Sequence, residues 1–249
     1  SAIVQFYSAD GSKALGTIEY VQSSSVQDDL KTMVLVVRAN ISNDFTPRFK
    51  IREADCYIDW GDGQAEYVIG NEWEGEWSNA KLIHEYDVDE PTSFTVRISG
   101  TVTSLDSEGV KAPCITEVVQ WGKTGLEHIS GAFKGNYLLK KVCDDPYNAL
   151  EKIYNIDQVF YRCSGLEEIP EGLFENCKDV STANETFREC SSLKSIPENL
   201  FSKCRNLYHM NSIFYVQTSA TPAGEYAGVD SVETKGDAPT NDLYLSVND

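Results

Sequence analysis

The feature that most limits how this chain folds is a repeat of 27 residues in its second half. Residues 160–180 (FYRCSGLEEIPEGLFENCKDV) and 187–207 (FRECSSLKSIPENLFSKCRNL) are identical at 10 of 21 positions without a gap. The same offset keeps apolar residues in most slots, and one slot is a column of phenylalanines: Phe133, Phe160, Phe187 and Phe214. Such a period predicts a solenoid, because a unit of this size cannot bury its apolar edge alone and has to stack on its neighbours.

Each unit fits one coil of an α/β solenoid of the leucine-rich-repeat type. Its L-x-x-I/A/M segment predicts a short strand, and 169–177 (IPEGLFENC) and 196–204 (IPENLFSKC) predict a short helical return. Proline suits the start of that return, where its missing N–H would have no partner. The solenoid is expected over 121–218, about three and a half coils, close to the minimum of roughly three. The segment 219–249 is predicted to be a C-terminal cap or tail, with 242–247 (DLYLSV) as a closing strand.

Four cysteines occupy two repeat slots in which the first coil has Asn136 and Leu150. They are Cys163, Cys177, Cys190 and Cys204. A slot that accepts leucine favours buried packing, in which free cysteine behaves as a small apolar side chain. Disulfides within the stack and a metal site are the alternatives, although the close paired spacing of zinc ligands is missing from the sequence.

Residues 1–120 have a different pattern, that of an antiparallel β-sandwich, so the whole chain is predicted to be mainly β with short helices. Alternating and β-branched runs are separated by Gly, Asp, Asn and Pro clusters, as in domains of many short strands. Strands are predicted at 3–8, 16–22, 32–41, 56–60, 65–70, 93–105 and 114–121. Cys56 and Cys114 lie in this unit, and the sequence leaves open whether they form a disulfide. Seven cysteines leave at least one thiol free, and Cys143 receives no role.

The rhythm F-x-x-C-x-x-L-x-x-I-P-x-x-L-F-x-x-C, at 160–177 and 187–204, resembles the BspA-like group of leucine-rich repeats. That group is found on surface proteins of gut and oral bacteria. The resemblance implies export to the cell surface, often as a lipoprotein, and a role in adhesion or in binding host or matrix components. We therefore expect an exported protein whose leader has been removed.

The segments 60–63 (WGDG), 84–86 (HEY) and 94–98 (FTVRI) are similar to the polycystic-kidney-disease (PKD) type of immunoglobulin-like domain. That family has a W-G-D-G hairpin turn, then H-x-Y, then an aromatic strand. The usual glycine before the last strand is replaced here by 90–92 (EPT), so the loop differs. Asp62 is expected to serve turn geometry by accepting bonds from nearby backbone N–H groups, with a calcium-binding or catalytic carboxylate as the alternative.

The sequence predicts no enzymatic activity, no cofactor and no metal. It has three histidines and contains no G-x-S-x-G, phosphate loop or H-E-x-x-H motif. His84 belongs to the sandwich motif and is expected to be packed and hydrogen-bonded. His128 and His209 share one strand slot but stand three coils apart, on the order of 14 Å, which is too far for one metal or one proton relay.

The outward positions of the predicted repeat strands are the candidate ligand-binding residues. They are Glu127, His128, Tyr154, Asn155, Thr182, Tyr208 and His209. A solenoid presents such positions as one continuous surface, and tyrosines among amides and hydroxyls suit recognition of a protein or a sugar. Beside them runs a polar column, Ser130, Asp157, Asn184 and Asn211. Asn184 and Asn211 are interpreted as hydrogen-bonding between coils, with a part in ligand recognition as the alternative.

The charge balance, 21 basic against 39 acidic residues for a net of −18, argues against nucleic acid and against an anionic membrane surface as partners. No apolar run approaches the ~20 residues that cross a bilayer. The expected function is adhesion at the cell surface to a host or matrix protein. A glycan-binding component of a carbohydrate-uptake system and a structural stalk module are the alternatives.

Overall fold

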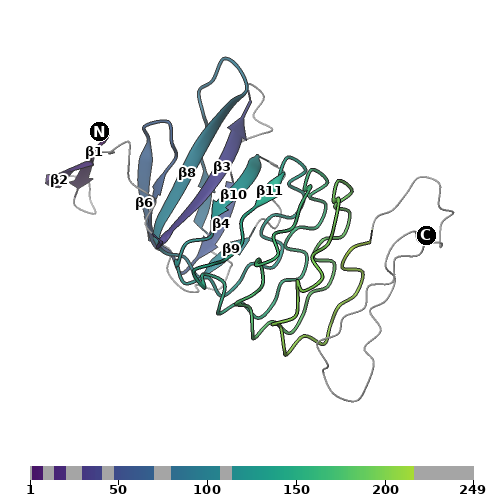
Figure 1. Cartoon of the computed structure of the whole chain (residues 1–249). Helices are drawn as coiled ribbons and strands as arrows, with labels where there is room; N and C mark the ends of the chain where they lie inside the picture. The colour runs from purple at the N-terminus through teal and green to yellow at the C-terminus, as the bar shows by residue number, and fades with distance from the viewer. Residues whose placement is uncertain are drawn as a thin grey trace.

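A computed structural model of the chain describes residues 2–7, 14–20, 30–40, 48–69, 80–106 and 114–215 (Figure 1). Within these ranges the protein is mainly β. The predicted cap or tail at 219–249, with its closing strand at 242–247, lies outside the described residues. No helix in the described ranges is long and apolar enough to span a bilayer.

The described residues form strands grouped into three sheets. The strands are β1 (Ala2–Tyr7), β2 (Ala14–Tyr20), β3 (Thr32–Ala39), β4 (Arg48–Arg52), β5 (Asp55–Asp59), β6 (Ala65–Ile69), β7 (Ala80–Ile83), β8 (Thr92–Thr101), β9 (Ser104–Asp106), β10 (Ile115–Gln120) and β11 (Lys141–Val142). β1 and β2 form a hairpin, a six-stranded sheet has the order β11-β10-β3-β8-β5-β6, and a three-stranded sheet has the order β7-β4-β9. The pairs are antiparallel except β10–β11, so the larger sheet is mixed.

The runs predicted as strands contain β1, β2, β3, β5, β6, β8, β9 and β10, although some ends differ. The apolar run of β3 forms a central strand between β8 and β10, and most of its side chains are buried. A near-continuous apolar run is typical of a strand covered on both faces. The sequence pattern missed β4 and β7, where basic residues interrupt short apolar runs, and β11, which has two residues.

The prediction of short helical returns is wrong for the described residues, because 169–177 and 196–204 form successive turns. The bonds there join residues three apart, as from the Leu173 N–H to the Pro170 oxygen (3.2 Å) and from the Cys177 N–H to the Phe174 oxygen (3.1 Å). Starting a helix fixes several residues for one hydrogen bond, so a return this short has little room to propagate one. The Pro-Glu-Gly sequence at 170–172 disfavours it further.

Successive repeats are joined by backbone hydrogen bonds at equivalent positions. We define the first repeat as 126–152, the second as 153–179 and the third as 180–206, with the fourth beginning at 207. The N–H groups of Gly131, Phe133 and Gly135 donate to carbonyls of the second repeat at 3.0, 2.9 and 2.7 Å. The second repeat donates to the third, and the third to the fourth, from the same slots. Each repeat is therefore held to the next by the same short ladder.

The phenylalanine column follows this ladder through the interior. Neighbouring rings of the column are stacked, and the distances between their centroids, taken in order from Phe133 to Phe214, are 5.6, 5.2 and 5.4 Å. The column begins on Trp121, just after β10, whose ring meets Phe133 edge-on at 5.9 Å. Offset stacked and edge-on pairs both suit the charge distribution of aromatic rings, so the column fixes side-chain geometry as well as burying area.

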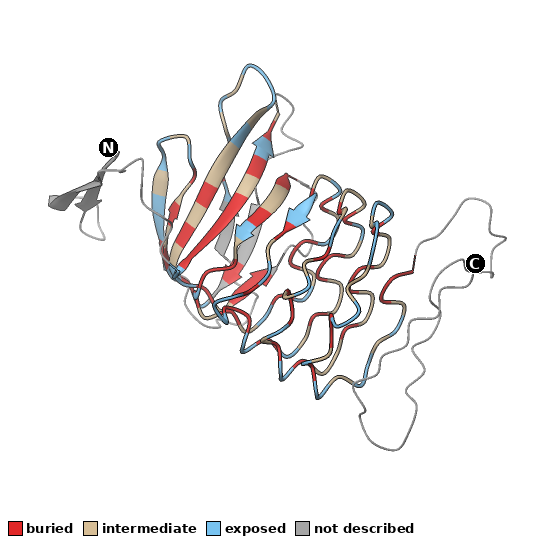
Figure 2. Ribbon diagram, in the orientation of Figure 1, coloured by how far each residue is buried: buried red, intermediate tan, exposed pale blue. Residues whose placement is uncertain are grey.

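The first repeat completes both larger sheets of the preceding unit. β11 pairs in parallel with β10 of the six-stranded sheet. On the other side, Ser104 of β9 forms a parallel bridge with His128, and the Leu105 N–H donates to the His128 oxygen at 3.0 Å. Buried side chains of both sheets and of the repeats belong to one core (Figure 2). The sheet thus continues across residues 120 and 121, where the domain boundary is predicted.

All seven cysteines are free thiols, including Cys56 and Cys114. In the Asn136 slot, the Cys163 thiol donates to the Phe133 oxygen and the Cys190 thiol to the Phe160 oxygen, both at 3.1 Å. Asn136 donates to the Phe133 oxygen at 3.2 Å. This slot is buried, as predicted, but it also requires a donor for a buried carbonyl, which the apolar interpretation missed.

Burial keeps these thiols protonated. It raises the pKa of Cys190 and of Cys204 from 9.0 to about 12, and that of Cys56 to about 11. The thiolate is the nucleophile, so a thiol that resists ionisation is a weak nucleophile near neutral pH. In the described residues, the cysteines therefore act as packing and hydrogen-bonding groups.

We expect the folded protein to resist thiol-specific reagents at pH 8 and to react at all seven cysteines in urea. The folded-state pKa values of the thiols lie above the unfolded value near 9.0. The stability that the protonated thiols contribute to the folded state is therefore fully present below about pH 9. It is lost as the pH rises through the folded-state values. Urea midpoints should fall between pH 9 and 11, and fall less in a Cys190→Ser, Cys204→Ala variant. Rapid labelling of several native thiols at pH 8 would contradict this account.

Candidate functional site

The seven predicted residues lie in two neighbouring columns on the repeats. We call these seven residues and Ser181, which completes the outer column, the strand face. The outer column is Glu127, Tyr154, Ser181 and Tyr208, and the inner column is His128, Asn155, Thr182 and His209. Parallel bridges join Asn155 to Thr182 and Thr182 to His209. The apolar slots on either side of these pairs are buried in the first three repeats, so the two residues between them are left at the surface.

Tyr154 and Tyr208 stand on either side of Ser181 in the outer column. The Ser181 N–H donates to the Tyr154 oxygen at 2.8 Å, and the Tyr208 N–H donates to the Ser181 oxygen at 3.1 Å. Strands at this spacing place the two tyrosine positions about 10 Å apart. Their side chains are 47% and 68% exposed, which leaves substantial aromatic area available to a partner.

Each histidine of the strand face accompanies a tyrosine. The Tyr154 hydroxyl hydrogen-bonds with His128 Nδ1 at 3.1 Å, and the two rings meet edge-on at 5.3 Å. The ring of Tyr208 lies 4.5 Å from that of His209. The His128 bond limits how the Tyr154 ring can turn, so this ring is held in place before any partner arrives.

The remaining polar groups on and beside the strand face differ in how free they are to hydrogen-bond with a binding partner. Lys152 and Glu127 form an exposed ion pair at 3.1 Å, a kind that contributes little to stability. Asn155 accepts the Asp157 N–H at 2.7 Å through its side-chain oxygen, which ties it to its own repeat. The Thr182 hydroxyl is buried and has no hydrogen-bond partner among the described residues. Asn155 and Thr182 thus offer less to a partner than the sequence suggests.

The polar column beside the strand face hydrogen-bonds between repeats, as predicted for Asn184 and Asn211. The Asp157 carboxylate accepts the Asn184 N–H at 2.6 Å, and the Asn184 side-chain oxygen accepts the Asn211 N–H at 3.0 Å. The Ser130 hydroxyl donates to the Asp157 carbonyl at 3.0 Å. These groups hold the repeats in register and are engaged in the fold.

A second column, which sequence reasoning missed, alternates cations with tyrosines in the slot after each phenylalanine, and its last member, Tyr215, is buried. Lys134 Nζ lies 5.0 Å from the Tyr161 ring centroid, and the Arg188 guanidinium lies 5.9 Å from Tyr161 and 4.6 Å from Tyr215. The signal was available, because these four residues recur at the repeat offset. Because cations of the chain itself lie over these rings, we interpret the column as stabilising the stack of repeats.

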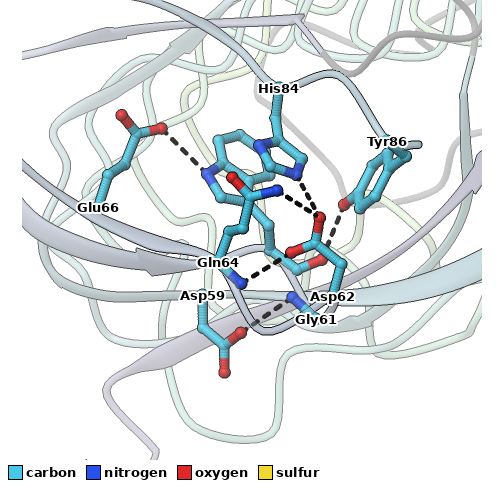
Figure 3. Close-up of polar contacts among 8 residues, drawn as sticks. Asp59, Gly61, Asp62, Gln64, Glu66, His84 and Tyr86 are labelled. Carbon is cyan, nitrogen blue, oxygen red and sulfur yellow. Dashed lines mark hydrogen bonds and ion pairs between the residues drawn. The ribbon is translucent and has the colours of Figure 1, made fainter. Parts of the chain in front are cut away.

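The W-G-D-G turn is a closed hydrogen-bond network (Figure 3). Asp62 Oδ1 accepts the Gln64 N–H at 2.9 Å, and His84 Nε2 donates to Asp62 Oδ2 at 2.8 Å. His84 is buried and stacks on Trp60 with ring centroids 4.6 Å apart. The Tyr86 hydroxyl donates to the Trp60 carbonyl at 2.8 Å. The predictions that Asp62 serves the turn and that His84 is packed and hydrogen-bonded are confirmed.

Both glycines of this turn have a positive φ, and Gly61 also has no room for a side chain. Gly61 has φ +82°, and an added Cβ would lie 2.5 Å from the Thr95 carbonyl oxygen. Its N–H donates to Asp59 Oδ1 at 2.9 Å. The backbone of the turn at Gly61 therefore lies directly against the backbone of β8 at Thr95. Asp62 is held by the Gln64 N–H at one carboxylate oxygen and by His84 at the other. Within the described residues no cluster of three or more His, Cys, Asp or Glu side chains is arranged to hold a metal ion.

We expect Asp157→Ala to lower the free energy of unfolding by about 1–3 kcal/mol, because the Asn184 N–H then loses its partner. Asp157→Asn should cost less, since an amide oxygen can still accept. Glu171→Ala, at an exposed position of the second repeat, is the matched control and should have little effect. Urea denaturation followed by circular dichroism measures all three, and equal midpoints for Asp157→Ala and the control would contradict the inter-repeat role.

Asp62→Ala should also destabilise the protein by about 1–3 kcal/mol, because it orphans the Gln64 N–H and His84 together. Calcium should leave the thermal midpoint of the unaltered protein unchanged. A midpoint that rises with calcium, and no longer does so in Asp62→Ala, would instead support the calcium alternative.

Comparison with protein-family models, with curated proteins and with solved structures finds no match for this chain. The features of the chain that bear on function are therefore the strand face, the turn network and the net charge.

Proposed function

We propose that this is a non-enzymatic surface protein of a bacterium, which binds a protein partner through the strand face. The observation that carries the proposal is the pair Tyr154 and Tyr208, two exposed rings in one column, each beside a histidine. Tyrosines contribute contact area at little cost in conformational entropy, and they are enriched in interfaces. The proposed partner is a host or matrix protein.

The proposed architecture is a PKD-like immunoglobulin sandwich followed by a short leucine-rich solenoid of the BspA-like kind. The turn network of Asp62 and His84 supports the first part, because it connects the three segments on which the resemblance rests. The repeated hydrogen bonds and the phenylalanine column support the second. Turns in place of helices set these repeats apart from the α/β form.

Export is part of the proposal, with attachment at the cell surface through a lipid as one form. The net charge of −18 suits a protein that remains in solution beside a cell envelope and does not adsorb to anionic polymers. The raised pKa of the Cys190 and Cys204 thiols makes these two groups weak nucleophiles, which is compatible with a binding protein. A glycan-binding component of a carbohydrate-uptake system and a stalk module are the rival proposals.

Replacing both tyrosines, Tyr154→Ala with Tyr208→Ala, should abolish binding and leave the thermal midpoint within a few degrees of the original. The matched control is Tyr137→Ala with Tyr147→Ala, because these rings are 48% and 43% exposed and lie outside the strand face. Each protein is screened by surface plasmon resonance against extracellular-matrix proteins and on a glycan array. At a hot spot, loss of a tyrosine typically weakens binding by roughly thirtyfold or more.

The class of ligand decides between the proposals. Matrix-protein binding that only the strand-face variant loses supports adhesion. Glycan binding lost in the same way supports the carbohydrate rival. Equal loss in both double variants, or binding that neither variant changes, would remove the strand face from consideration.

A further inference from the structure

The six-stranded sheet ends in a strand whose outer edge has no partner strand among the described residues. In the part of the chain that the structure describes, β6 pairs only with β5, in a regular register from Asp55–Ile69 to Asp59–Ala65 without a bulge. The Trp60 N–H donates to the Gln64 oxygen at 3.0 Å, which identifies that pair as hydrogen-bonded. Bonded and non-bonded pairs alternate in antiparallel strands, so the N–H and C=O groups of Ala65, Tyr67 and Ile69 point away from β5.

The side chains of β6 leave this edge open to another strand. Tyr67 and Ile69 are 53% and 64% exposed. The strand contains no proline, lysine or bulge, which are the usual devices that protect an edge from pairing. By contrast, the edges of β10 and β9 are covered by the first repeat, through β11 and the bridge to His128. In the described residues, the edge strands β9 and β10 are thus covered by the first repeat, whereas the outer edge of β6 has no neighbouring strand.

The charges around this edge select its occupant. β5 and β6 carry Asp55, Asp59 and Glu66 and no basic residue, and the nearest cation across the register is Arg97, opposite Asp59. A second copy of the chain would bring the same carboxylates and a net charge of −18 to the contact. Like charges across paired strands are destabilising, so the edge favours a strand with lysine or arginine.

We propose that β6 is a docking edge for an extended basic segment of a partner protein, which adds as a seventh strand to this sheet. The main-chain groups of Ala65, Tyr67 and Ile69 would supply the hydrogen bonds. The exposed side chains of Tyr67 and Ile69 would meet alternate apolar residues of the segment, and Glu66, on the opposite face of β6, would meet its basic ones. Asp55 and Asp59 lie one strand further in, on the face of Tyr67, and add to the negative field at the edge. Strand addition obtains affinity from the main chain and specificity from alternate side chains. This site is separate from the strand face.

The intact chain is tested with three capped seven-residue peptides, one alternating valine and lysine, one alternating proline and lysine, and one alternating valine and glutamate. The first should bind, and amide exchange measured by NMR should slow at Ala65, Tyr67 and Ile69. The amides of Glu66 and Val68 already face β5 and should not change. The proline peptide has the same charge but lacks strand donors, so binding of equal strength would reduce the effect to general attraction and overturn the proposal.

Two variants separate the backbone from the ring. Tyr67→Pro removes one outward N–H and keeps the bonds to β5, and it should weaken binding by roughly tenfold. Tyr67→Ala keeps the N–H and should weaken binding less. Equal effects of the two variants would overturn main-chain docking. Unaltered protein that forms dimers by analytical ultracentrifugation, which Tyr67→Pro dissociates, would show that the occupant is a second copy and overturn the basic partner.

Discussion

The constraint on which the rest of the structure depends is the spacing that one strand ladder imposes on the 27-residue repeat. Three N–H groups of each repeat reach three carbonyls of the next, and this fixes neighbouring repeats at the distance at which phenylalanine rings stack. The same spacing aligns the Asp157 carboxylate with the Asn184 N–H and places the tyrosines of the strand face in one column. A side chain suited to one repeat is therefore suited to the next, which explains why identity persists at buried slots.

The first repeat also determines how the two halves of the chain depend on each other. By pairing with β10 and bridging to β9, it gives both larger sheets a neighbour and shares their core. Repeat proteins usually need a dedicated cap at each end, because a terminal repeat exposes apolar surface. Here the amino-terminal sheets perform that task, with Trp121 as the first ring of the aromatic column. Stability should accordingly be lost in both halves together.

Sequence alone predicted the repeat, its buried slots, most strands and the separate roles of Asp62 and His84, because each rests on a local pattern or a fixed offset. It did not predict β4, β7 or β11, whose short runs become strands only through their partners. It also predicted a helical return, because Ile-Pro-Glu suggests a helix start. The return is too short for a helix, and its length is set by the three-dimensional path of the repeat and not by that local motif. The candidate residues lie where predicted, yet Asn155 bonds to its own repeat and the Thr182 hydroxyl is buried, and both depend on side-chain conformations that a sequence pattern does not specify. The partnership of His128 and Tyr154 depends on neighbouring repeats, so no motif within one repeat reveals it.

The ladder at the turns runs in one direction, because each repeat donates its N–H groups to the carbonyls of the repeat that follows. At the turns, one side of a repeat therefore carries donors and the other carries acceptors. In the outer column of the strand face the bonds run the opposite way, from the Ser181 N–H to the Tyr154 oxygen and from the Tyr208 N–H to the Ser181 oxygen. Each contact between repeats thus combines two ladders of opposite direction, so a repeat can meet its neighbour in only one orientation.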